Sequence, residues 1–163
     1  MPQASDLNSG AYFYFMKIEE EIKQVKFKSL HQKAVINLIF TSGWLQGQQQ
    51  QFFKSVGLTN QQFNILRILK GQHPKTISAT EIKSRMLDKN SDVSRLLNRL
   101  EAKGLIHKQS CPKDKRAFDV IITTAGLDVL ADLDKKQKQI DTVLHLSEKE
   151  AEELSDLLDK GRG

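Results

Sequence analysis

The stretch that most constrains the fold is residues 90–104, NSDVSRLLNRLEAKG, in which apolar residues recur at helical spacing. Val93, Leu96, Leu97 and Leu100 stand at positions i, i+3, i+4 and i+7, so they form one stripe along a helix. The opposite side carries polar and basic residues: Ser91, Ser94, Arg95, Asn98 and Arg99. Lys103 and then Gly104 make a helix stop, because glycine readily adopts a positive φ. Such a face is more often simply solvated than functional, so the flanking segments decide its meaning.

A second, shorter helix is expected just before this one. Ser78 and Glu81 have the spacing of a capping box, and Ile82, Met86 and Leu87 follow as a short apolar face. Residues 88–90 then form a turn, after which the side chain of Asn90 or Ser91 can cap the next helix. Two short helices joined by a tight turn, the second with a basic outer face, are typical of a helix-turn-helix.

A hairpin with a basic tip is expected after the helices. Residues 105–109 and 118–122 are predicted to be strands. Between them, residues 110–116, SCPKDKR, are predicted to form a polar turn with three cations. Residues 76–78 could supply a third, very short strand beside this hairpin. A helix-turn-helix followed by such a hairpin predicts a winged helix.

Residues 114–126, DKRAFDVIITTAG, resemble the wing signature of the MarR family, D-x-R-x-x-x-V-x-L-T-x-x-G, with Ile122 where leucine is usual. Residues 58–66 resemble the opening helix of that family, and residues 100–106 resemble the end of its recognition helix. The resemblance covers about residues 58–126. It implies a mainly α-helical (α+β) winged helix-turn-helix DNA-binding domain with dimerisation helices on either side.

The positive charge is concentrated where this domain would meet phosphates. The net charge of the chain is +5, but residues 57–126 hold 13 Lys and Arg against 6 Asp and Glu. Residues 127–163 hold 6 against 10, and residues 1–56 hold 6 against 4. This distribution favours nucleic acid as a partner more strongly than a uniform basic charge would.

The chain is predicted to consist of four segments. We expect a flexible leader over 1–15, N-terminal dimerisation helices over 16–56 with a bend near Gly43 and Gly47, the winged domain over 57–126, and C-terminal dimerisation helices over 127–163. Apolar residues with near-heptad spacing support the N-terminal pairing: Leu30, Ala34, Leu38, Leu45, Phe52 and Val56. The C-terminal segment has a stripe that includes Leu127, Leu130, Leu133, Ile140 and Leu144. Thr59 with Gln62 and Ser147 with Glu150 are further capping boxes, and Thr124 can cap the helix after the wing. Helices that need partners on both sides of one domain predict a homodimer.

No residue pattern argues for an enzyme or for a cofactor. The four histidines are scattered without metal-ligand spacing, and no glycine-rich phosphate loop or nucleophile motif occurs in the sequence. Cys111 is flanked by Lys113 and Lys115, which favour a reactive thiolate, although an ordinary loop thiol is the more common case. The sequence has no apolar run long enough to span a membrane and no secretory leader pattern, so we expect a cytoplasmic protein without membrane contact.

The expected function is sequence-specific binding of double-stranded DNA by a homodimeric transcriptional repressor. The residues expected at the DNA are Ser91, Ser94, Arg95, Asn98, Arg99, Lys113, Asp114, Lys115 and Arg116. The helix residues among them would read the major groove, and Arg116, oriented by Asp114, would enter the minor groove. The half-sites would be centred about 10–10.5 base pairs apart.

The family resemblance also implies a small aromatic or anionic effector that releases the repressor. Trp44, Phe52, Phe53 and Phe63 could line its pocket, although packing in the core is the more common role of such residues. The alternative function is a winged-helix protein-interaction module that does not bind DNA. The operator, the effector and the regulated genes cannot be deduced from the sequence.

Overall fold

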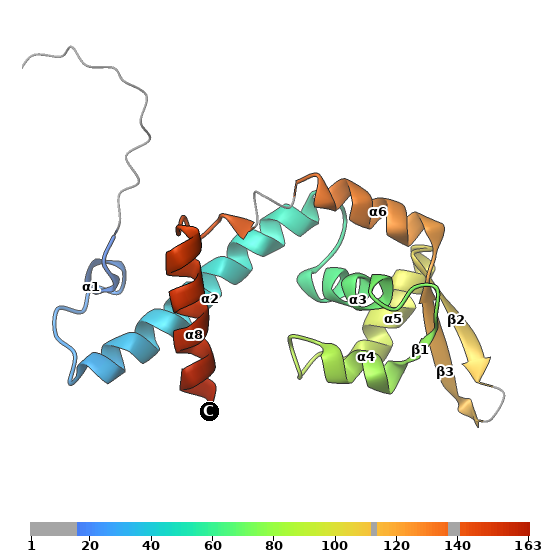
Figure 1. The fold of residues 1–163 in the computed structure, drawn as a ribbon, viewed down its shortest axis with the longest axis horizontal. Coiled ribbons are helices and arrows are strands. Elements are labelled where there is room, and N and C mark those ends of the chain that lie inside the picture. Colours follow the sequence, from blue (N-terminus) through green and yellow to red (C-terminus); the bar gives the residue numbers. More distant parts are fainter. Residues whose placement is uncertain (1–15, 112–113, 137–140) are drawn as a thin grey trace, which may run out of the picture. The chain divides into compact units, whose positions relative to one another are not determined.

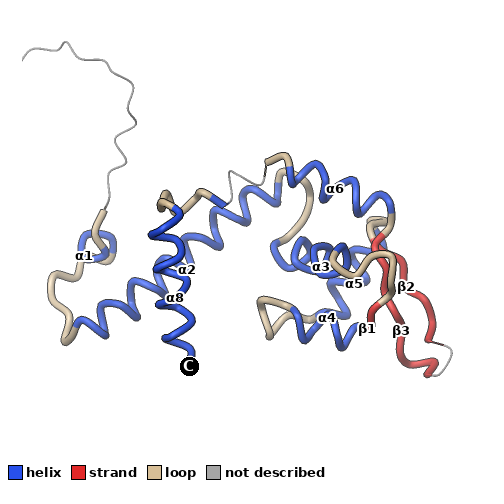
Figure 2. The backbone as a smooth tube through the Cα atoms, in the orientation of Figure 1, coloured by secondary structure: helices blue, strands red, loops and turns tan. Residues whose placement is uncertain are grey.

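The structure is a computed structural model, and it describes residues 16–111, 114–136 and 141–163, with the side chains of residues 110–117 left undescribed. The chain consists of two compact units, Met1–Trp44 and Leu45–Gly163. Figure 1 shows the order of the elements, and Figure 2 shows that the strands are confined to one small sheet within a largely helical chain. This composition confirms the predicted mainly α-helical winged-helix class.

The first unit holds α1 (Ile18–Glu21) and the beginning of α2 (Leu30–Lys54). The two helices are separated by residues 22–29, where Lys23 has a φ of +54° just after the end of α1. Lys33 Nζ lies 2.6 Å from Glu19 Oε1 and ties the start of α2 to α1. The helix assignment of α2 includes both Gly43 and Gly47.

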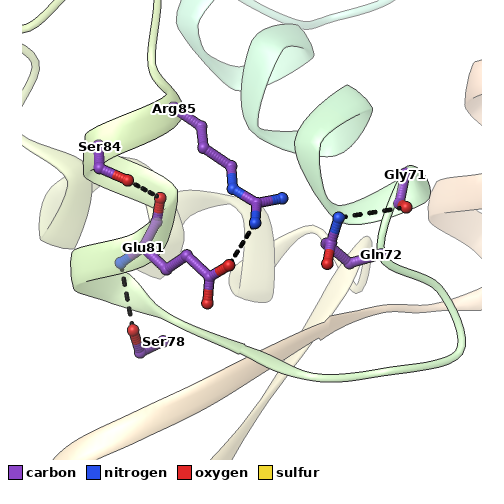
Figure 3. A network of polar contacts seen from close by, with 6 residues as sticks. All are labelled: Gly71, Gln72, Ser78, Glu81, Ser84 and Arg85. Carbon is purple, nitrogen blue, oxygen red and sulfur yellow. Dashed lines mark hydrogen bonds and ion pairs between the residues drawn. The ribbon is translucent and has the colours of Figure 1, made fainter.

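Side-chain caps set the beginnings of the first two helices of the winged domain. α3 (Asn60–Lys70) begins with the complete Thr59–Gln62 capping box that the sequence predicts. α4 (Ala79–Arg85) begins at Ser78, whose hydroxyl accepts from the Glu81 backbone N–H at 3.1 Å. The second half of that predicted box is wrong, because the Glu81 carboxylate pairs with Arg85 one turn along the helix (Figure 3).

α5 (Val93–Ala102) corresponds to the predicted second helix. Its cap is Asp92, whose carboxylate accepts from the Arg95 backbone N–H at 3.0 Å, so the predicted caps Asn90 and Ser91 are wrong. The helix ends as expected at Gly104, which has a φ of +69°. The backbone N–H groups of Gly104 and Leu105 donate to the carbonyls of Glu101 and Leu100, which is the Schellman arrangement.

The sheet consists of β1 (Ile77–Ser78), β2 (Ile106–Cys111) and β3 (Asp114–Ile122), antiparallel and in the order β1-β3-β2. The short third strand is therefore confirmed, with Ile77 opposite Val120. Both hairpin strands are longer than predicted, because Cys111 still pairs with Asp114 after an irregularity at Ser110. The predicted turn over residues 110–116 is therefore too long.

The core of the second unit lies between the sheet and the helices that cover it. α3 contacts α4, α5, α6 and β3, so it stands at the centre of this packing. The largest fully buried side chains of this core come from α3, α4, α5, α6, β3 and the residue after α4: Ile65, Leu66, Leu69, Ile82, Met86, Leu97, Leu100, Val120, Leu130 and Leu133.

Two helices follow the wing. α6 (Thr124–Asp134) is capped by Thr123 rather than by Thr124 as predicted, and it buries Leu130 and Leu133. Asp134 at its end accepts from Arg67 and Lys70 of α3 at 2.8 and 2.7 Å. The predicted stripe residue Ile140 lies outside the described residues. α8 (Glu148–Arg162) begins with the predicted Ser147–Glu150 capping box, and none of its residues, all of which are described, is buried.

Candidate nucleic-acid interface

α5 presents one apolar side to the core and one polar side to solvent, as the sequence predicts. Val93, Leu97 and Leu100 are buried. The exposed side is formed by Ser94, Arg95, Asn98 and Arg99. Because its apolar side is locked into the core, the helix can hold its exposed side chains in a fixed frame, which is what base recognition requires.

The turn before α5 is held by Asp88. Its carboxylate accepts from the Asn90 backbone N–H at 3.0 Å and from the Ser91 hydroxyl at 2.9 Å. The hydrogen bond from Ser91, followed by that from Asn90, lowers the pKa of the Asp88 carboxyl. Ser91 therefore lies in the turn, half-buried and already hydrogen-bonded, and not on the helix with Ser94. In the same region Asn64 of α3 accepts from the Leu87 backbone N–H at 2.9 Å.

Asn98 is part of a polar network that the sequence reading missed. The Lys108 ammonium of β2 donates to Asn98 Oδ1 at 2.7 Å and lies 2.6 Å from Glu101 Oε2. The Lys108 backbone N–H also donates to Glu101 Oε1 at 3.2 Å. The hydrogen bond from the Lys108 side chain is the main reason why the pKa of Glu101 is lowered. The signal in the sequence was faint, because contact between α5 and β2 depends on the hairpin register.

The basic wing is only partly described. Asp114, Lys115 and Arg116 have backbones in β3, so Arg116 lies within a strand rather than in the predicted turn. Their side chains and all of Lys113 lie outside the described part of the structure, as does the expected contact between Asp114 and Arg116. The thiol of Cys111 is likewise not described.

Arg99 lies on the margin of the exposed face and also lines a shallow hollow of about 550 Å³. This hollow is bounded by the end of α2, the beginning of α3 and the end of α5. Its lining residues are Lys54, Gly57, Leu58, Thr59, Gln62, Arg99, Ala102 and Lys103. Lys103 Nζ also donates to the Gly57 carbonyl. Three cations around one concave surface make it suited to an anion.

The four aromatic residues predicted to line an effector pocket have different surroundings. Phe53 is buried and stacks on Phe63 with ring centroids 4.5 Å apart, while Phe52 meets Phe53 edge to face at 5.2 Å. Arg67 lies over the Phe63 ring at 5.7 Å. Trp44, in the first unit, is 41% exposed. The three phenylalanines fill core space in the second unit, and none of the four lines the hollow beside Arg99.

Among the described residues, no group of three or more His, Cys, Asp or Glu side chains is placed to hold a metal ion. Within the same ranges, no helix is both long and apolar enough to cross a membrane.

Comparison with known proteins identifies related sequences and folds. The family model described as "MarR family" matches residues 56–117. A MarR transcription factor from Planctomyces limnophilus is 32% identical, with a TM-score of 0.65 over 82% of this chain and 98% of that one. No curated protein matches the chain.

Two solved structures that contain DNA share the fold. MepR from Staphylococcus aureus in a DNA complex has a TM-score of 0.68 and 23% identity, over 83% of this chain and 96% of that one. Sco3205 from Streptomyces coelicolor in complex with DNA has a TM-score of 0.71 and 20% identity, over 84% and 89%.

Proposed function

Because this chain belongs to the MarR family of transcription regulators, we propose that it is a homodimeric repressor that binds a pseudo-palindromic DNA operator. Members of the family are transcription regulators, so the chain is a regulator and not an enzyme. The finer parts of the proposal are the sequence-specific contact, the dimer and the control by a small ligand.

The exposed face of α5 is the observation that carries the proposal. Ser94, Arg95 and Asn98 project from a helix whose opposite side is immobilised in the core. Arginine and asparagine are the side chains that make bidentate contacts with guanine and adenine in the major groove, while serine can bond either a base or a phosphate. Arg116 of the wing, with Lys113 and Lys115, would add affinity through the minor groove and phosphates. Asp114 would orient Arg116 by a charge-assisted bond.

The dimer is supported by apolar side chains that a single chain leaves in water. Of the 25 residues of α2, all described, Phe53 alone is buried. Leu30, Ile39 and Val35 are 84%, 67% and 57% exposed. Large apolar side chains exposed together along one helix are costly in water and are typical of a protein interface. Pairing with a second copy would place two α5 helices on one duplex, which is why the operator is expected to be a palindrome with half-sites about 10–10.5 base pairs apart.

A small anionic effector is the third part of the proposal. The hollow lined by Lys54, Arg99 and Lys103 supports it better than the aromatic cluster does, because the phenylalanines already pack against one another. An anion there would contact the end of α2 and the end of α5 together. It would thereby couple a helix proposed to dimerise to the helix proposed to read DNA.

Duplex binding over a salt series tests the proposal. Sequences are selected from a random duplex pool, and the affinity for the selected site and for a scrambled one is measured as salt rises. We expect a palindromic consensus, a steep loss of affinity with salt, and a dimer in sedimentation at micromolar concentration. A monomer with no salt-dependent affinity for duplex would instead favour the protein-interaction module.

Addition of benzoate to the selected complex tests the effector, with Lys54→Gln as the matched variant. Lys54 lines the hollow but lies outside α5. Benzoate is expected to weaken duplex binding by the wild type and to affect the variant less.

A further inference from the structure

We propose that Lys108 determines which base Asn98 recognises, by holding the Asn98 amide so that it donates to guanine in preference to pairing with adenine. This inference rests on the proposed function, because it assumes that α5 lies in the major groove. It makes Lys108 a positioning residue for base recognition, acting through Asn98.

The contacts of Lys108 fix its ammonium beside the C-terminal half of α5. The ammonium lies 2.7 Å from Asn98 Oδ1, 2.6 Å from Glu101 Oε2 and 5.3 Å from the centroid of the Phe118 ring. The Lys108 side chain is 20% exposed, which is low for a lysine. An anion, an amide oxygen and an aromatic face therefore surround the charge, and each favours a cation at that position.

Lysine can only donate hydrogen bonds, and this settles the orientation of the amide. An ammonium has three N–H donors and no acceptor, so the Asn98 atom that faces it must be the carbonyl oxygen and not the –NH₂ group. The planar amide is then fixed with Oδ1 toward β2 and with its two N–H donors turned away from that strand. Asn98 is exposed, so these donors are available to a ligand.

The fixed orientation changes the base that suits this asparagine. A free asparagine pairs with adenine in a bidentate manner, accepting from N6–H and donating to N7. The hydrogen bond from Lys108 uses one lone pair of Oδ1 and holds this oxygen toward β2, so the side of the amide turned away from β2 presents its two N–H donors. Guanine offers two acceptors at its major-groove edge, N7 and O6, whereas adenine places an N6 donor beside its N7. Guanine is therefore the expected partner.

Glu101 holds the Lys108 ammonium beside Asn98 in the protein that has not bound DNA. Its carboxylate is ionised at neutral pH, as a glutamate ordinarily is. The hydrogen bond from the Lys108 side chain lowers the pKa of Glu101 further, so the pair favours the charged form. Ammonium and carboxylate together are neutral, so the pair adds little to the general attraction for phosphate. Removal of the Lys108 charge would leave the Glu101 carboxylate uncompensated and weaken binding to every duplex. The change in recognition is therefore measured as the ratio of the bases selected at one position.

The test is selection of binding sites from a random duplex pool with the full-length protein and a set of variants. Asn98→Ala identifies the operator position that Asn98 reads, because that position alone should lose its preference. Lys108→Met keeps an apolar side chain over Phe118 but removes the ammonium, and Lys108→Arg keeps the charge and the donors. Lys75→Met is the matched control, since Lys75 is an exposed lysine of the same domain, in the turn before β1.

We expect the wild type and Lys108→Arg to select guanine at the position that Asn98 reads. Lys108→Met should shift that position toward adenine by a factor on the order of tenfold in the ratio of the two bases. The other positions should stay unchanged, and Lys75→Met should keep the wild-type preference throughout. Lys108→Leu is the second variant if Lys108→Met loses its helical circular dichroism, because an aliphatic side chain also lacks hydrogen-bond donors and releases Asn98.

Two results would overturn the inference while leaving the proposed function intact. In the first, Lys108→Met selects the same consensus sequence as the wild type. In the second, the wild type already selects adenine at the position where Asn98→Ala removes the base preference. If the wild type enriches no sequence at all, the proposed function itself is wrong and the inference falls with it. A double variant, Asn98→Ala with Lys108→Met, should select the same sites as Asn98→Ala alone, because Lys108 acts through Asn98.

Discussion

Gly126 is the residue at which a single added methyl group should do the most damage. It is buried in the first turn of α6, next to the carbonyl of Leu105 and the side chain of Ile122. A Cβ built there would lie 2.3 Å from the Leu105 oxygen and 2.7 Å from Ile122 Cγ1. Neither neighbour can retreat easily: the Leu105 oxygen accepts from the Thr123 N–H at 3.1 Å, and Ile122 belongs to the core.

The magnitude follows from two opposing effects. Alanine in place of glycine favours a helix by about 1 kcal/mol. Forcing an extra carbon into a packed core costs about 1–3 kcal/mol, and a clash with backbone belongs at the upper end. Gly126→Ala should therefore lower the free energy of unfolding by about 2 kcal/mol, which is about 4–8 °C in Tm for a chain of this size.

Urea unfolding followed by circular dichroism at a fixed protomer concentration measures this effect. Gly161→Ala in α8 is the matched control, because no atom lies within 4 Å of the Cβ it would add. That control should be neutral or slightly stabilising. If Gly126→Ala were as stable as the wild type, the close approach of α6 to Leu105 would be wrong.

Three further predictions concern single residues. Thr59→Ala removes the hydroxyl that accepts from the Gln62 N–H at 3.2 Å, and thermal unfolding should show a loss of about 1 kcal/mol. The hydrogen bond from Lys70, and then the charge of Arg67, lower the pKa of Asp134, so its ionised form favours the folded state and this contribution is lost as the pH falls through the lowered value. Asp134→Asn should therefore destabilise by less than about 1 kcal/mol at pH 7, because the pair is partly exposed, and should match the wild type in strong acid. Arg116→Ala should weaken binding to all duplexes alike and reduce the salt slope by about one counterion, as gel-shift titrations over a salt series would show.

The winged domain was the part most predictable from the sequence, because its signals are local. The apolar stripe of Val93, Leu97 and Leu100 fixed the buried side of α5, and positive φ at Gly104 fixed its end. The capping boxes at Thr59 and Ser147 were correct for the same reason, since all their partners lie within three residues. The register of the hairpin was less certain, and both strands extend further than the pattern indicated.

The errors arose where several residues could play one role or where distant residues meet. Asn90, Ser91 and Asp92 can each cap a helix, and Asp92 caps α5. The Ser91 hydroxyl instead donates to the Asp88 carboxylate in the preceding turn. The Glu81 carboxylate could cap α4 or pair with Arg85, and it pairs with Arg85. The contact of Lys108 with Asn98 joins a strand to a helix, and no periodicity in the sequence indicates it.

The measurement that most directly tests the role of α5 is the ratio of affinities for the selected operator and a scrambled duplex. Arg95 lies exposed in the first turn of the helix, so Arg95→Ala should remove a base contact. We expect this variant to lose about 1–3 kcal/mol of binding free energy on the operator and much less on the scrambled duplex, so that the ratio falls on the order of tenfold. Arg116→Ala should leave the ratio unchanged. If Arg95→Ala and Asn98→Ala both left the ratio of operator to scrambled affinity unchanged, the assignment of α5 as the base-reading helix would be wrong.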